Sequence, residues 1–118
     1  MNTVEKGKRG EDIAVKYLVE RGYKIKKRNY HAGHKEIDII AELPDTIVFV
    51  EVKWRKESII SSPIDAVNYR KQQYLFKAAN NYVIRNNIDK NVRFDVIGII
   101  EDNFSFEHIE DAFSPFGG

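Results

Sequence analysis

Two acids and a lysine interrupt apolar runs in the stretch "EIDIIAELPDTIVFVEVKWRK", residues 36–56. Asp38 lies within one β-branched run, and Glu51 and Lys53 lie within another. Carboxylate oxygens are ligands that Mg²⁺ prefers, and a lysine beside them can orient a water or offset charge on a phosphoryl group. These residues are therefore candidates for a metal-assisted site that hydrolyses phosphodiester bonds.

The two runs predict a β-hairpin, with strands over 36–41 and 47–54 around a turn that contains Pro44 and Asp45. Side chains alternate along a strand, and directly opposed residues of an antiparallel pair share a face. A register in which opposed residue numbers sum to an odd value therefore puts the acids on one face. The other face is then aliphatic and comprises Ile37, Ile39, Ala41, Val48, Val50 and Val52.

The odd register closest to a four-residue loop over 43–46 pairs Asp38 with Glu51, Glu36 with Lys53, and Ile40 with Phe49. Opposed Cβ atoms lie about 5 Å apart, so two bare carboxylates there would repel each other. A bound cation would remove this repulsion. The chain has no cysteine, so the ligands of any metal are oxygen or imidazole, and we expect Mg²⁺ or Mn²⁺.

The flanking segments predict helices and further strands. Apolar residues recur every three or four positions over 3–21, which is typical of an amphipathic helix, and Gly22 suits its C-terminal end. Residues 23–30 predict a strand near the sheet edge. Further strands are predicted over 92–100 and 104–109.

A second helix is predicted to begin with Ser62 as N-cap, Pro63 at the first helical position and Asp65 near the third, and to end at about Arg85. Its inner stripe comprises Ile64, Val67, Leu75, Ala78, Ala79, Tyr82 and Val83, with Lys71 on the same stripe. A helix between two strands most simply connects parallel neighbours. We therefore expect one α/β domain over 1–118, with a mixed sheet of about five strands flanked by helices.

Composition favours a packed soluble protein, with 42% hydrophobic and 31% charged residues. The polar N-terminus lacks the apolar core of a signal peptide, and no apolar stretch is long enough to span a bilayer, so we expect a cytoplasmic protein. The net charge is only +1, but the segment 21–35 is basic and contains no acid. This segment is either a solvated strand face or a phosphate-binding surface; the candidate nucleic-acid contacts are Lys26, Arg28 and Arg55.

The triplets "EID" and "EVK" resemble the D…ExK core of the PD-(D/E)xK, or restriction-endonuclease-like, nucleases. Together with "GKRGEDIAVKYLVERGY", "RNY", "EIDII", "VFVEVKWR", "YRKQ", "AANNYV" and "RFDVIGI", they resemble the YraN-like family of bacterial endonuclease-like proteins over nearly the whole chain. Archaeal Holliday-junction resolvases share the core. The chain departs from the pattern at Ile37, in place of the proline, and at Lys35, in place of a glycine before Glu36.

The resemblance implies a metal-dependent DNA endonuclease, with branched or single-stranded DNA as substrate. It implies Asp38, Glu51 and the Val52 carbonyl as metal ligands, Lys53 as the catalytic lysine, and Glu11 and Glu36 as accessory acids. Lys71 and Gln72 match a pair that lies near the substrate backbone in related nucleases. A homodimer would place two such sites on one substrate.

Other readings stay open at this stage. An E-x-K triplet is usually a surface ion pair, Glu11 can pair with a cation on its own helix, and Lys71 can extend its charge to solvent. A non-catalytic nucleic-acid-binding module with the same fold is the alternative function. His31 and His34 are expected to be solvated, Trp54 to be in the core, Asp95 to pair with Arg93 or Lys53, and Tyr69 and Tyr74 are candidates for stacking on bases.

Overall fold

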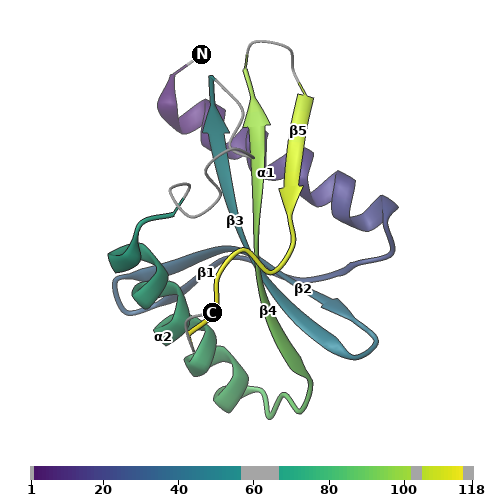
Figure 1. The fold of residues 1–118 in the computed structure, drawn as a ribbon, viewed down its shortest axis with the longest axis vertical. Coiled ribbons are helices and arrows are strands. Elements are labelled where there is room, and N and C mark those ends of the chain that lie inside the picture. Colours follow the sequence, from purple (N-terminus) through teal and green to yellow (C-terminus); the bar gives the residue numbers. More distant parts are fainter. Residues whose placement is uncertain (1, 57–66, 102–104, 116–118) are drawn as a thin grey trace.

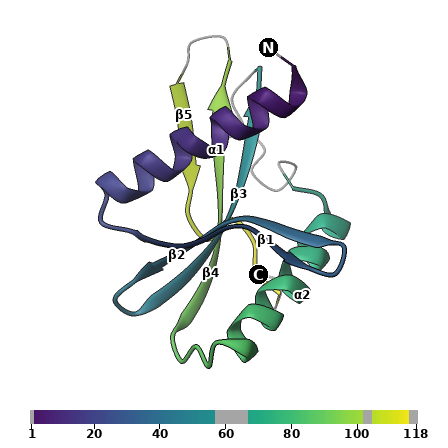
Figure 2. The same cartoon turned by 180° about the vertical axis from the view of Figure 1, so that it is seen from behind.

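The computed structural model describes residues 2–56, 67–101 and 105–115 of the chain, and shows a twisted sheet with a helix on each face (Figures 1 and 2). In chain order the elements are α1 (Thr3–Glu20), β1 (Lys24–Ala32), β2 (Lys35–Leu43), β3 (Thr46–Arg55), α2 (Tyr69–Arg85), β4 (Asn91–Ile100) and β5 (Ser105–Ile109). Within these residues the strand order is β1-β2-β3-β4-β5. The pair β3–β4 is parallel and the other pairs are antiparallel, which confirms the predicted mixed sheet and the predicted order of elements.

The hairpin of β2 and β3 has the predicted register. Ile40 opposes Phe49, and the last pair before the turn is Leu43 with Thr46. The turn itself is therefore Pro44 and Asp45, which is shorter than the four-residue loop that we expected. Pairing with β3 begins only at Ile39, so the predicted pairs of Asp38 with Glu51 and of Glu36 with Lys53 lie beyond the paired segment.

The two faces of the sheet carry separate apolar clusters. On the α1 side the buried residues are Ala14, Leu18, Tyr23, Ile39, Ala41, Val48, Val50, Ile97 and Ile99, with Trp54 packed against them as expected. On the α2 side they are Ile37, Ile40, Ile47, Phe49, Val67, Leu75, Ala78, Ala79, Tyr82, Phe94 and Val96. The predicted inner stripe of the second helix is thus confirmed from Leu75 onward.

Ile37 corrects the predicted alternation. It was expected beside Ile39 but lies in the α2-side cluster, together with Tyr30, its partner on β1. Because Ile37 and Ile40 are on one side while Ile39 is on the other, strict alternation breaks around Asp38. The physical reason is that β2 follows β1, and no longer β3, in this part of its course.

Helix α1 ends as the sequence predicts. Gly22 has φ +88°, and its amide donates to the Val19 carbonyl while the Tyr23 amide donates to the Leu18 carbonyl. These are the two hydrogen bonds of the Schellman motif, which favours glycine because the left-handed conformation strains other residues. Tyr23 then packs beside Leu18 in the α1-side cluster and starts the chain toward β1.

Helix α2 begins later than predicted. The expected start at Ser62, Pro63 and Asp65 lies outside the described residues, but Val67 and Asn68 are not helical and the helix begins at Tyr69. The Asn68 side chain caps it by accepting a hydrogen bond from the Lys71 amide at 2.9 Å. Within the described residues, no helix is long and apolar enough to cross a membrane.

Candidate active site

Asp38 lies where β2 stops pairing with β3. Its Oδ2 accepts a hydrogen bond from the backbone amide of Val52 at 2.8 Å. A carboxylate thus binds an amide of β3 just beyond the last recorded backbone pair, Ile39 with Val50. This contact fixes the Asp38 side chain against the backbone between Glu51 and Lys53.

Glu51 is 5% exposed and is held between two lysines. Lys53 Nζ lies 3.4 Å from its Oε1, and Lys71 Nζ, which comes from α2, lies 3.8 Å from the same oxygen. The other oxygen, Oε2, is buried and has no hydrogen-bond partner among the described residues. A buried carboxylate oxygen without a hydrogen-bond partner lowers the stability of the folded state. A ligand that gives this oxygen a partner would therefore bind favourably here.

The pKa of Asp38 is raised to about 7. Burial is the largest cause, followed by the negative charge of Glu51, with a smaller contribution from Glu11. The Val52 amide and the positive charge of Lys71 act in the opposite direction. Charges from β3, α1 and α2 therefore all act on this one carboxyl group.

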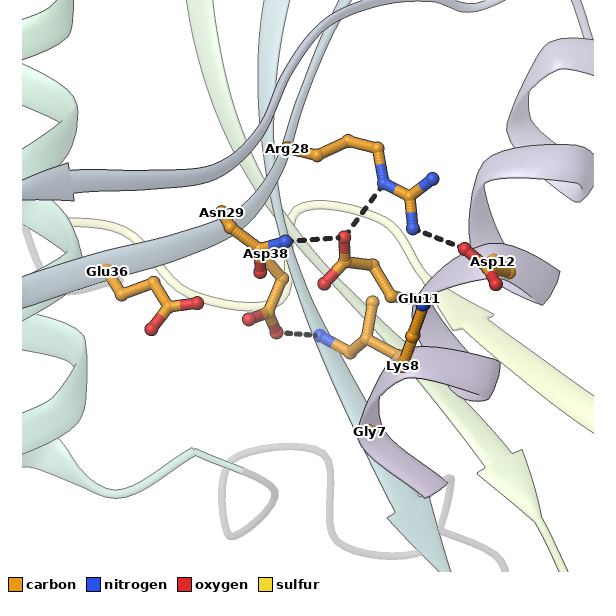
Figure 3. A pocket seen from close by; sticks show the side chains of 9 residues that line it. Gly7, Lys8, Glu11, Asp12, Arg28, Asn29, Glu36 and Asp38 are labelled. Atoms are coloured by element: carbon orange, nitrogen blue, oxygen red, sulfur yellow. Dashed lines mark hydrogen bonds and ion pairs between the residues drawn. The ribbon is translucent and has the colours of Figure 1, made fainter. Parts of the chain in front are cut away.

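A pocket of about 670 Å³ opens beside Asp38 (Figure 3). Its lining residues are Gly7, Lys8, Glu11, Asp12, Arg28, Asn29, Glu36, Asp38 and Val52. In the view of Figure 3 the carboxylates of Glu36 and Glu11 lie on either side of the Asp38 carboxylate. The lining contains four acids and two cations, and two of the acids, Glu11 and Asp12, pair with Arg28.

Glu11 reaches this pocket from α1 and is held by β1. Its Oε1 accepts hydrogen bonds from Arg28 Nε at 2.8 Å and from Asn29 Nδ2 at 3.1 Å. The alternative that Glu11 pairs with a cation on its own helix is not what the structure shows, because its partners are on a strand. Asn29 has φ +51°, and the pairing of β1 with β2 shifts register between Ile25 and Lys27, so local backbone irregularity accompanies this contact.

The predicted nucleic-acid contacts are spread over three elements. Lys26 is exposed on β1, Arg55 is partly exposed at the end of β3, and Arg28 pairs with both Glu11 and Asp12 in the pocket. Lys71 and Gln72 lie in the first turn of α2, where Gln72 Nε2 donates to the Val67 carbonyl at 2.8 Å. The structure places Lys71 beside Glu51, whereas Lys26 makes none of the described contacts with the carboxylates of the site. His31 and His34 are exposed, as expected.

Asn29 and Lys8 are pocket residues that the sequence reasoning missed. Asn29 gave a weak signal, since it is the middle residue of "RNY", a motif that carries the family resemblance. Lys8 gave none, because an exposed lysine on an amphipathic helix is ordinary.

A second polar cluster lies away from the carboxylate site. Asp95 is fully buried and accepts hydrogen bonds from Arg93 Nε at 2.9 Å, Arg93 Nη2 at 2.8 Å and the Asp111 amide at 3.0 Å. His108 Nε2 lies 2.7 Å from its Oδ2. Burial alone would raise the pKa of Asp95, but these hydrogen bonds hold it below its ordinary value. Of the two predicted partners, Arg93 is confirmed and Lys53 is not, because Lys53 pairs with Glu51.

The donor set of the carboxylate site fits Mg²⁺ or Mn²⁺. Asp38 and Glu51 offer oxygens whose mutual repulsion a cation would relieve, and Mg²⁺ is usually held by one or two carboxylates with several waters. In the described part of the chain, no three His, Asp or Glu side chains are close enough to form a complete metal site. The protein side chains would thus provide a partial coordination shell, with water, substrate or the Val52 carbonyl completing it.

The order of elements and the mixed five-stranded sheet agree with the restriction-endonuclease-like fold that the sequence resembles. The model of the family described as "Uncharacterised protein family UPF0102" matches residues 10–99. This chain belongs to that family, which is the YraN-like family that the sequence motifs indicated.

Individual relatives match almost end to end. A UPF0102 protein of Phocaeicola vulgatus is 41% identical over 94% of this chain and 93% of its own length. One of Alkaliphilus oremlandii is 47% identical over 88% and 93% of the two chains, and one of Clostridioides difficile is 41% identical over 96% and 100%. The similarity thus includes the segments that carry Glu11, Asp38, Glu51 and Lys53.

Proposed function

We propose that this protein is a metal-dependent DNA endonuclease that hydrolyses phosphodiester bonds. The observation that carries the proposal is that the negative charge of Glu51 acts on Asp38 at the place where β2 leaves β3, with Lys53 Nζ 3.4 Å from Glu51. Two carboxylates can hold a metal ion for phosphodiester hydrolysis, and a lysine beside them can stabilise charge that develops on the phosphate. Membership in the family supports the fold but not this activity.

Asp38 and Glu51 would hold Mg²⁺ or Mn²⁺, with the Val52 carbonyl as a further ligand and Glu11 and Glu36 as accessory acids around the pocket. When bound, the ion lowers the pKa of a coordinated water and neutralises charge on the phosphate. The overall reaction adds water across one P–O bond and yields a phosphomonoester and a free hydroxyl group.

The residues of the chain have distinct parts in this proposal. Lys53 shares a strand with Glu51, so its ammonium can orient the attacking water or stabilise the developing negative charge on phosphoryl oxygens. Lys71 enters the same site from α2 and supplies a second positive charge. Arg28 and Asn29 hold Glu11 in one orientation at the edge of the pocket.

The test compares purified wild-type protein with Asp38→Asn and Lys53→Met on supercoiled, single-stranded and branched DNA, with EDTA, Mg²⁺ or Mn²⁺. Lys90→Met is a matched control, because Lys90 also pairs with a glutamate, Glu42, but outside this site. We expect cutting that requires metal, is lost in both site variants and is retained in the control. Light scattering on the same samples tests whether the protein is a dimer.

A non-catalytic nucleic-acid-binding module is the second candidate, and the lysine pairs favour it. Lys53 and Lys71 already neutralise Glu51 without a metal, which is what a protein that no longer binds the ion would require. This candidate predicts salt-sensitive DNA binding, unchanged by Asp38→Asn, and no cutting with either metal. That result would reject the nuclease proposal.

A further inference from the structure

Two tyrosines on the first two turns of α2 are exposed. Tyr69 is 75% exposed and Tyr74 is 43% exposed. Lys35, at the start of β2, places its ammonium 5.6 Å from the centre of the Tyr74 ring. The hairpin of β1 and β2 and the first turns of α2 thus meet at one surface.

The charge of α2 is unusual for the start of a helix. Its sequence contains Arg70, Lys71, Lys77 and Arg85 and no acid, and its first turn has no acidic residue. A helix N-terminus carries partial positive charge and is stabilised by anions, so cations in the first turn are unfavourable unless an anion offsets them. Glu51 offsets Lys71, and a bound phosphate would do the same for Arg70 and the helix terminus.

This surface is continuous with the proposed active site. Lys71 Nζ lies 3.8 Å from Glu51 Oε1, and Lys35 directly precedes Glu36, which lines the pocket beside Asp38. A strand bound along the first turns of α2 would therefore pass Lys71, which lies beside Glu51.

We propose that Tyr69 and Tyr74, with Lys35, Arg70 and Lys71, form a platform for single-stranded nucleic acid. The bases stack on the tyrosine rings and the phosphates lie against the cations. In a duplex each base face is covered by its neighbours, so an exposed aromatic ring selects unpaired nucleotides. This inference rests on the proposed function, because it gives the platform the role of delivering an unpaired strand to the carboxylate site.

The test is fluorescence anisotropy of a labelled oligothymidylate with the full chain in EDTA, where metal-dependent cutting cannot occur. Tyr69→Ala and Tyr74→Ala are each expected to weaken binding roughly tenfold, since base stacking on one ring contributes about that factor. Tyr69→Phe and Tyr74→Phe keep the ring and should bind like wild type. Ile84→Ala is the matched control, because Ile84 is 65% exposed near the other end of α2.

Two further arms define the partner. A duplex of mixed sequence should bind the alanine variants and wild type alike, and an oligouridylate compared with the oligothymidylate distinguishes RNA from DNA. Arg70→Gln should lower the slope of log affinity against log salt by about 0.7, as expected for one lost phosphate contact on a single strand. Thermal melting confirms that each variant is folded.

The platform is refuted if the alanine variants bind the single strand like wild type, or if they lose duplex and single-strand binding equally. Its failure can be told from failure of the nuclease proposal. Metal-dependent cutting that does not depend on the tyrosines rejects the platform alone. Tyrosine-dependent binding by a protein that cuts no substrate rejects the nuclease and leaves the platform.

Discussion

Replacing Asp38 by asparagine should stabilise the metal-free protein at high pH. The Asp38 carboxyl has a pKa raised from an ordinary 3.8 to about 7, first because it is buried and second because Glu51 is negative. Asparagine removes the charge but keeps a side-chain oxygen that can accept the Val52 amide hydrogen bond. The substitution therefore removes the electrostatic cost while preserving the main contact.

The sign and pH range follow from linkage. Between pH 4 and 7 the folded state keeps the Asp38 proton that the unfolded state has lost, so wild-type stability declines as pH rises through this range. Each unit of pKa shift corresponds to about 1.4 kcal/mol, so the shift of about 3 units sets an upper limit near 4 kcal/mol. Because the Asp38 carboxyl faces a water-accessible pocket that screens its charge, we expect about half of this, roughly 2 kcal/mol.

The assay is urea unfolding in EDTA at pH 4, 6 and 8, followed by circular dichroism. Asp38→Asn should match wild type at pH 4 and exceed its free energy of unfolding by about 2 kcal/mol at pH 8. Asp89→Asn is the control, because Asp89 is exposed after α2 and its substitution should give no such pH trend. Mg²⁺ added at pH 8 should stabilise wild type more than the variant, since the ion binds only the folded site.

The reasoning fails if Asp38→Asn is equally or less stable than wild type at pH 8 without metal. That outcome would mean that the Asp38 carboxylate is ionised at little cost, so the Glu51 charge does not reach it through a poorly solvated space. The two acids would then not form the shared site on which the proposed function depends.

Four further substitutions test contacts that hold the fold and the start of α2. Asp95→Asn should lower the free energy of unfolding at pH 7 by about 3 kcal/mol, because it leaves Arg93 without its buried charged partner. The difference between variant and wild type should shrink in acid, where the wild-type carboxyl, whose pKa is lowered, becomes protonated. Gly22→Ala should lower the free energy of unfolding by about 1 kcal/mol, because residue 22 has φ +88°. Gly7→Ala should be neutral or stabilising, because no atom lies close to the added Cβ within α1. Urea unfolding measures both. Asn68→Ala should cost about 1 kcal/mol by removing the cap of α2, and anisotropy should show weaker single-strand binding.

The hairpin was predictable because two independent constraints agree. The turn formers Pro44 and Asp45 fix where the chain reverses, and the aliphatic residues around Val48 and Val50 leave only one parity that buries them together. The end of α1 was predictable for a similar reason, since Gly22 supplies the left-handed residue that a Schellman end uses. Local chemistry was sufficient at both positions.

The contacts of the site depend on partners distant in sequence. Nothing local indicates that Glu11 is held by Arg28 and Asn29, or that Lys71 of α2 reaches Glu51. The start of α2 was predicted wrongly for a different reason. The sequence has a strong capping signal at Ser62, but Asn68 caps the described helix. Competing local signals of comparable strength cannot be ranked without the packing that selects between them.

The assumption of strict alternation along β2 did not predict that its pairing with β3 ends before Asp38. In a regular sheet a charge on α1 and a charge on α2 are separated by the full thickness of the sheet and its two apolar clusters. At Asp38 the pairing of β2 with β3 has ended, and the pKa of this one carboxyl responds to Glu11 from α1 and to Lys71 from α2. The divergence of β2 therefore coincides with the point at which charges from both faces act on a single carboxylate. A variant that restored continuous pairing through Asp38 would remove this arrangement even if it retained every acid and lysine of the site.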